Sequence, residues 1–205
     1  MRGSLSVPVI VEAAFRVLER LGLSGVTARA VAAELGVRQS ALYHHLPDMA
    51  ALLDEMATSM RREMVGEWPA DWEQVMARTG NTLRRVLLAR RDGGRLFAGR
   101  RLRDPSLLPL MEEPLRILVA AGLSLPLAVT AMQSVVDLTV GFVIEEQHRA
   151  SGESGGYDPE QRRRLIPEAE FPLTAAASAP LFAPPDERFA IALSLLIDGV
   201  RTRLG

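Results

Sequence analysis

Residues 26–46 contain two short stretches with helical spacing that meet at Gly36. Thr27 is a favourable N-cap for the first stretch, and Val26 and Val31 stand at the positions of a hydrophobic staple. Gly36 has no Cβ and therefore allows the left-handed turn that ends a helix. The spacing predicts two short helices joined by a tight turn, and the rest of the chain must bury their apolar sides.

The second of these helices has an apolar side and a polar side. Leu42 and Leu46 are expected to be buried, and Val37 and Leu42 repeat the staple spacing. The other side carries amides, hydroxyls and rings, whereas an ordinary surface helix carries mostly charges. This pattern indicates a helix-turn-helix whose second helix enters the major groove of DNA. The side chains expected on the exposed side are Gln39, Ser40, Ala41, Tyr43, His44 and His45.

Side-chain chemistry suggests separate roles for the residues on this surface. Gln39 can pair with adenine through two hydrogen bonds, and Arg38 can pair with guanine in the same way. Ser40 can bond to either type of base, and Ala41 can contact a thymine methyl. The side chains expected to hold phosphates are Thr27, Tyr43, His44 and His45, while Arg29 is expected on either a phosphate or a base.

The remaining chain also has helical periodicity and no convincing strand, so we predict an all-α protein with nine or ten helices. A break at Trp68-Pro69 separates the N-terminal helices from the others, and residues 150–185 are rich in Ser, Gly, Pro and Ala, which predicts a loop with partial helix. Outside the helix-turn-helix, helices are expected at residues 8–21, 47–65, 71–91, 105–121, 125–149 and 186–204.

Residues 123–144 are apolar and nearly long enough to span a bilayer. Asp137 near their middle would cost about 3 kcal/mol in lipid, so we expect a buried helix in a soluble dimer. Gln133 and Asp137 lie four residues apart and share a side. As buried polar groups they need partners, either across a dimer interface or in a cavity. Glu12 interrupts the apolar N-terminus, which argues against a signal peptide and for a cytoplasmic protein.

The composition excludes several function classes. There is no cysteine, which excludes disulfides, thiolate metal sites and cysteine nucleophiles. His44 and His45 point about 100° apart on a helix and cannot easily chelate one ion. The neighbouring acids at 112–113 and 145–146 make no catalytic pair for the same reason. We therefore expect no catalytic residue, no metal site and no cofactor, and the net charge of −1 is compatible with DNA binding only through local positive charge.

The segment GVTARAVAAELGVRQSALYHHLPDMAALLDEM at residues 25–56 resembles the DNA-binding domain of the TetR family, and within it the tetracycline-repressor class. Weaker similarity continues at residues 83–94, at 138–147 and in the last helix. The resemblance implies a homodimeric, ligand-responsive transcriptional regulator, with repression rather than activation as the family expectation. Two copies would read a palindromic double-stranded operator whose half-sites lie about 34 Å apart.

The resemblance also implies a division into two domains. Residues 1–47 would form a helix-turn-helix DNA-binding domain, and residues 48–205 a ligand-binding and dimerisation domain. The helix at 48–66 would connect them and transmit the state of the ligand pocket. Helices 125–149 and 186–204 would form a four-helix bundle with the partner.

The sequence departs from tetracycline repressors in the pocket. Phe97 stands where that class has a metal-ligating His, and Arg100 replaces a nearby Thr, so the effector is not expected to be a tetracycline–magnesium complex. Glu145 does match a pocket glutamate of the class. Met49 replaces a Lys of many relatives, so one phosphate contact is expected to be absent. The pocket predicted from these positions is lined by Phe97, Met111, Val129, Met132 and Val136, with Arg100 or Glu145 as polar anchors for a small, largely apolar effector.

Two alternatives stay open at this point. The arginines Arg95, Arg100, Arg101 and Arg103 form either a solvated basic loop or the entrance of the ligand pocket. The whole chain could also be a helical small-molecule-binding protein or enzyme with a non-functional DNA-binding hairpin.

Overall fold

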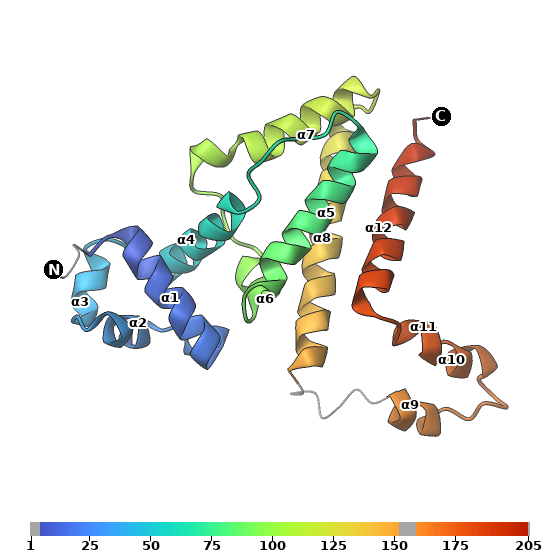
Figure 1. Cartoon of the computed structure of the whole chain (residues 1–205), viewed down its shortest axis with the longest axis horizontal. Coiled ribbons are helices and arrows are strands. Elements are labelled where there is room, and N and C mark those ends of the chain that lie inside the picture. Colours follow the sequence, from blue (N-terminus) through green and yellow to red (C-terminus); the bar gives the residue numbers. More distant parts are fainter. Residues whose placement is uncertain (1–4, 152–158, 205) are drawn as a thin grey trace.

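The structure is a computed structural model that describes residues 5–151 and 159–204. In these ranges the chain forms α-helices, two short 3-10 helices and no strand, which confirms the all-α prediction. Figure 1 shows α1–α3 at one end of the molecule and α12 at the other, with α5 and α8 between them. The helices are α1 (Val7–Leu21), α2 (Ala28–Leu35), α3 (Gln39–Tyr43), α4 (Met49–Arg62), α5 (Trp72–Leu88), α6 (Gly93–Phe97), α7 (Pro109–Ala120), α8 (Leu125–Ala150), α9 (Pro159–Leu165), α10 (Pro172–Ala176), α11 (Ser178–Leu181) and α12 (Pro185–Arg201), with 3-10 turns at Leu23–Gly25 and Pro105–Leu107.

The predicted helix-turn-helix is formed by α2 and α3. The Thr27 hydroxyl accepts a hydrogen bond from the Ala30 N–H at 3.2 Å, which caps α2 as expected. Gly36 adopts the left-handed conformation with φ of 65° and ends the helix. Val26 and Val31 are both buried in the same core cluster, as the first staple requires. The second staple is weaker, because Val37 stays 37% exposed.

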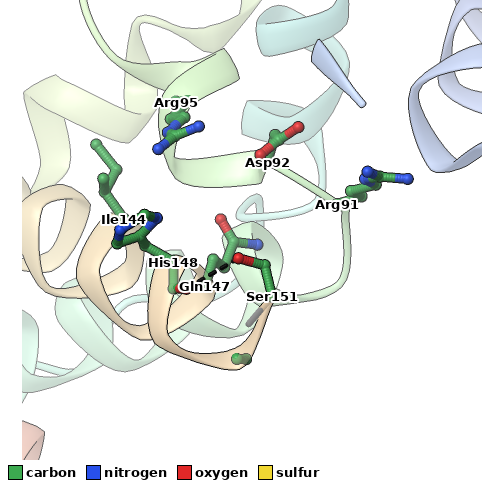
Figure 2. Close-up of a pocket in the computed structure, with 8 residues that line it drawn as sticks. Arg91, Asp92, Arg95, Ile144, Gln147, His148 and Ser151 are labelled. Carbon is green, nitrogen blue, oxygen red and sulfur yellow. Dashed lines mark hydrogen bonds between the residues drawn. The ribbon is translucent and has the colours of Figure 1, made fainter. Parts of the chain in front are cut away.

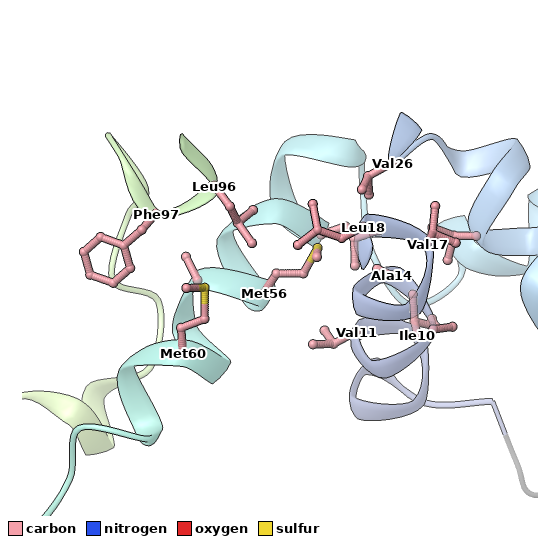
Figure 3. Close-up of a cluster of buried hydrophobic side chains, with 14 of the residues drawn as sticks. Ile10, Val11, Ala14, Val17, Leu18, Val26, Met56, Met60, Leu96 and Phe97 are labelled. Atoms are coloured by element: carbon pink, nitrogen blue, oxygen red, sulfur yellow. The ribbon is translucent and has the colours of Figure 1, made fainter. Parts of the chain in front are cut away.

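Two clusters of buried apolar side chains make up the core. The first joins α1–α4 to α6 and to the ends of α5 and α8, and the second lies among α5, α7, α8 and α12. Figure 3 shows Met56 and Met60 of α4 between α1 and the α6 residues Leu96 and Phe97. The connecting helix α4 therefore shares one core with the DNA-binding helices. A domain boundary at residue 47 stays a prediction.

α8 is long and apolar enough to cross a membrane, and only 28% of that stretch is buried inside the chain. One side packs on α5, α6, α7 and α12. The other side of α8 has no neighbour in the described part of the single chain, so the expectation of a helix buried in a dimer stays a prediction. Large apolar side chains stay exposed on α8 and on α12, where Ile191 is 60% and Leu195 is 67% exposed.

Arg84 of α5 forms ion pairs with residues of α8 and α12. Its guanidinium donates to both carboxylate oxygens of Glu146 on α8, at 2.8 and 3.1 Å, and to Asp186 on α12 at 2.7 Å. It also lies 5.1 Å from the ring centroid of Phe189. Glu146, expected from the sequence to be an ordinary surface acid, is thus a partly buried partner that fixes α8 against α5.

The helix count exceeds the prediction because short helices form where turn residues dominate the sequence. α9, α10 and α11 are each seven residues or fewer and lie in the segment expected to be mostly loop. α6 is a single turn that follows directly on the Asp92 turn. Short helices like these lack the length over which apolar periodicity can be recognised.

Candidate functional site

The residues predicted to contact DNA belong to α2, α3 and the residues beside these helices, and both helices lie at one end of the molecule (Figure 1). Ala41 is half-buried, and the others are exposed as expected: Thr27, Arg29, Arg38, Gln39, Ser40, Tyr43, His44 and His45. α3 offers this surface because Leu42 and Leu46 anchor its other side in the first core. The Gln39 amide nitrogen lies 3.5 Å from the Tyr43 hydroxyl, which holds the two side chains side by side on one turn. Their roles on bases and phosphates stay a prediction.

Ion pairs hold α2 against α1. Glu34 accepts hydrogen bonds from Arg16 at 2.8 Å and from Arg20 at 3.1 Å. The hydrogen bonds from Arg16 and Arg20 lower the pKa of the Glu34 carboxyl, so the carboxylate is charged at neutral pH. These contacts orient α2 and, through the Gly36 turn, the helix that follows it.

A cavity of about 300 Å³ lies among α4, α5, α6, α7 and α8. Six of the seven residues predicted for the ligand pocket line it, and the members that sequence reasoning missed include Arg61, Met64, Trp68, Leu83 and Gln133. Val129, Met132 and Val136 recur at the i, i+3 and i+7 positions of α8, which places them on one side of that helix. The predicted lining residues found in the cavity are Phe97, Arg100, Met111, Val129, Met132 and Val136.

Glu145 does not line this cavity in the single chain, and its role as a polar anchor for the effector stays a prediction. It lines a separate depression of about 60 Å³ beside Phe142 and Arg149. Glu145 follows Val136 by nine residues, which on an α-helix is a rotation of about 180° and a rise of about 13 Å. The same helix that brings Val136 to the cavity therefore turns Glu145 away from it.

Arg61, in the last turn of α4, is a polar lining residue that the sequence did not single out. Its Nη2 donates to the Arg100 carbonyl at 2.9 Å, and its guanidinium carbon lies 4.4 Å from the Phe97 ring centroid. Burial lowers the pKa of Arg61, and the charge of Asp54 opposes this shift. No signal in the sequence identified it, because the burial of Asp54 and Ala57, which share its side of α4, is known only from the structure.

The arginines of the segment 95–104 divide between the two alternatives. Arg100 lines the cavity, whereas Arg95 and Arg101 are exposed outside it. Arg103 donates through Nε to the carboxylate of Asp54 at 2.8 Å. Asp54 is only 5% exposed. This contact ties the segment to the middle of α4.

Gln133 and Asp137 bond to each other, with the amide nitrogen 2.8 Å from the carboxylate. Gln133 lines the cavity, while both side chains also remain exposed in the single chain. The choice between a cavity and a dimer interface for this pair stays open, since Gln133 reaches the cavity while Asp137 is exposed outside it.

A second depression of about 410 Å³ lies where α6 meets the end of α8 (Figure 2). Its centre is Gln147, whose amide donates to the Arg90 and Leu87 carbonyls at 2.7 and 3.3 Å and accepts from the Gly94 N–H at 3.2 Å. Asp92 accepts from the Leu23 N–H at 2.8 Å. This turn therefore connects α8 to the DNA-binding helices.

The lining of this second depression is mostly polar and includes Arg91, Arg95 and His148 (Figure 2). In the described part of the chain, no group of three His, Cys, Asp or Glu side chains is placed to hold a metal ion. The depression is best understood as the surface of the junction, because Asp92 and Gln147 already have backbone partners there.

An exposed helix-turn-helix and a cavity that meets its connecting helix define a one-component DNA-binding regulator. Comparison with known families specifies it further. Residues 10–56 match the family described as "Bacterial regulatory proteins, tetR family", and residues 66–204 match "Tetracyclin repressor-like, C-terminal domain". The chain belongs to the TetR family, whose members are soluble DNA-binding transcriptional regulators that act as dimers and are not enzymes.

Individual members of the family are similar to this chain in sequence and in structure. The tetracycline repressor protein class A from transposon 1721 of Escherichia coli is 35% identical over 95% of this chain and 89% of its own length. A possible TetR family regulator from Streptomyces coelicolor A3(2) is 31% identical, with a TM-score of 0.84 over 96% of this chain and 99% of its own. The S. coelicolor protein ActR in complex with actinorhodin is 25% identical, with a TM-score of 0.86 over 99% of this chain and 98% of its own. The predicted resemblance to the family and to tetracycline repressors is confirmed.

Proposed function

We propose that this protein is a transcriptional repressor that leaves a palindromic operator when a small, largely apolar effector fills the cavity between α4 and α8. The observation that carries the proposal is the cavity itself. Its volume of about 300 Å³ lies in the range of small-molecule sites, about 300–1,000 Å³. Most of its lining is apolar, and its wall includes the end of the helix that leads to the DNA-binding unit.

Support for transmission comes from two parts of α4. Arg61, in its last turn, and Met64, just beyond it, line the cavity, while Met56 and Ala57, in its middle, are buried in the core shared with α1. An effector that moves the end of α4 would move α1–α3 with it. Since two half-sites lie about 34 Å apart, a small change in the spacing of two recognition helices is enough to lose the operator.

The same cavity argues against a tetracycline–magnesium chelate as effector. The phenyl ring of Phe97 offers Mg²⁺ no ligand, and the Arg100 guanidinium repels a cation. Glu145 lies outside the cavity. We therefore assign an effector that binds without a metal ion.

Dimerisation is assigned to the exposed apolar sides of α8 and α12. Leu125 on α8, and Ile191 and Leu195 on α12, are more than one-third exposed in the single chain. An apolar surface of this kind is typical of a protein interface. A dimer that reads chromosomal DNA is a cytoplasmic protein in bacteria.

The proposal is tested with DNA from upstream of the protein's own gene, by fluorescence anisotropy at moderate salt. Gln39→Ala and Tyr43→Ala should each weaken operator binding by about tenfold or more while the dimer stays intact, because both side chains are exposed on α3. Glu55→Ala on α4 is the control and should bind as the parent does. An unchanged operator complex in both α3 variants would instead favour a binding protein with a non-functional hairpin.

A further inference from the structure

We infer that the molecule taken by the α4–α8 cavity is an organic acid, whose anionic group binds Arg61 while its apolar body fills the remaining space. This inference rests on the proposed function, and it specifies the chemical class of the effector. The juxtaposition that carries it is a partly buried guanidinium, with one buried and unpartnered nitrogen, at the wall of a mostly apolar cavity.

The charge of the cavity wall has one sign. Two guanidinium groups, those of Arg61 and Arg100, line the cavity, and its lining contains no Asp or Glu. The carboxylate near Arg61 is that of Asp54, and it accepts a hydrogen bond from Arg103 at 2.8 Å. The single Asp54 carboxylate balances only part of the charge of Arg61, Arg100 and Arg103, so the wall keeps a positive charge that an anionic ligand would complement.

The hydrogen bonds of Arg61 leave one nitrogen available. Nη2 donates to the Arg100 carbonyl, and the Phe97 ring lies against the plane of the group at 4.4 Å. Nη1 is buried and has no hydrogen-bond partner in the described part of the chain. A buried charged donor without a partner is costly, so a ligand oxygen at Nη1 would remove that cost.

Two neutral polar groups of the wall already have hydrogen-bond partners within the chain. Thr79 donates its hydroxyl hydrogen to the Val75 carbonyl at 2.9 Å, and the Gln133 amide nitrogen bonds to Asp137 at 2.8 Å. Arg100 donates through Nε to the Leu96 carbonyl at 3.3 Å, which holds its charge beside the cavity. Arg61 is thus the donor best placed to orient a carboxylate or sulfonate, and Arg100 supplies a second positive charge.

The placement of Arg61 also gives the acid a direct effect on the switch. Arg61 belongs to the last turn of α4, which ends at Arg62. An anion held by its guanidinium pulls on the helix that packs against α1. A neutral ligand of the same shape would fill the cavity without this force.

The test uses the full-length protein and two fluorescent probes that differ only in charge, anilinonaphthalene sulfonate and its sulfonate-free parent phenylnaphthylamine. The sulfonate should bind the parent protein about tenfold more tightly than the neutral probe. Arg61→Met should weaken sulfonate binding about tenfold and change the affinity for the neutral probe less than twofold. Arg101→Met removes an equal charge from an exposed neighbour of the cavity wall and should change neither affinity.

Two further variants separate a binding role of Arg61 from a structural one. Arg61→Lys keeps the charge without the planar fork, so it should retain part of the preference for the sulfonate. Val136→Trp fills the cavity and should abolish the saturable binding of both probes. Equal weakening of both probes by Arg61→Met, or tight binding of the neutral probe by the parent protein, would overturn the inference.

Operator binding measured on the same samples distinguishes this inference from the proposed function. If Arg61 governs the sulfonate preference but no bound acid releases DNA, the inference stands and the repressor proposal fails. If neutral compounds release DNA and Arg61→Met responds to them as the parent does, the repressor proposal stands and the acid assignment fails.

Discussion

Gln147 is predicted to be a main determinant of stability, although it lies in neither the DNA-contacting surface nor the effector cavity. Its side-chain amide bonds to three backbone groups of the turn between α5 and α6, at 2.7, 3.3 and 3.2 Å. Gln147→Leu keeps the size and helix propensity of the side chain and removes all three hydrogen bonds. Each is worth about 1 kcal/mol, and the Gly94 N–H would be left without its acceptor.

The expected cost of Gln147→Leu is therefore about 3 kcal/mol in the free energy of unfolding. The two carbonyls keep backbone partners, Gly93 on Arg90 and Arg90 on Leu87, so the loss should not exceed this by much. In a chain of this length the change should lower Tm by roughly 6–12 °C.

The assay is urea denaturation followed by circular dichroism, at a fixed protein concentration because the dimer links stability to concentration. Glu145→Ala, two residues earlier on α8 and exposed, is the matched control and should change stability by less than about 0.5 kcal/mol. A Gln147→Leu protein within that same margin of its parent would refute the reasoning that these hydrogen bonds hold the turn.

Three other perturbations have expected outcomes. Hydrogen bonds from Ser106, together with one from Arg62, lower the pKa of Asp104 to about 2. The charged carboxylate therefore stabilises the fold above about pH 4, and this contribution is lost as the pH falls towards 2. The free energies of unfolding of the parent and of Asp104→Asn, measured against pH, should converge near pH 2. Leu195→Glu places a charge on the exposed apolar side of α12 and should give a monomer by light scattering, with loss of operator binding; a stable dimer would contradict the assigned interface. Gly93→Ala would place a Cβ 2.1 Å from the Leu87 carbonyl oxygen and should cost more than about 3 kcal/mol, whereas Gly141→Ala meets no atom within 4 Å in the single chain and should not; equal stabilities by denaturation would contradict this difference.

The helix-turn-helix could be predicted from sequence because each of its determinants is local. The Thr27 cap, the Val26–Val31 staple and the Gly36 turn are all set by residues within a few positions of one another. The same holds for the side of α8 that lines the cavity, where Val129 and Val136 follow helical spacing. The spacing of residues along one helix was sufficient to predict which of them share a side of that helix.

Features that depend on long-range contacts could not be predicted. Arg61 reaches the cavity because its guanidinium meets Phe97 and the Arg100 carbonyl, 36 and 39 residues away in the chain. Glu145 was placed by resemblance, and the rotation of α8 beyond Val136 carries it elsewhere. α8 was expected to be buried in a dimer, and what covers its second side cannot be read from one chain, because that side has no neighbour among the described residues.

The short helix α6 has a consequence for how this protein can be changed. Gly93 at its first position belongs to the turn that Gln147 and Asp92 fix, and Phe97 at its last position lines the cavity. A single helical turn of about 7 Å cannot bend, so its two ends move as one body. Substitutions at Phe97 that enlarge or reshape the cavity therefore also set the resting position of the DNA-binding unit. A biosensor redesigned for a new compound should be screened for operator affinity without ligand as well as for its response.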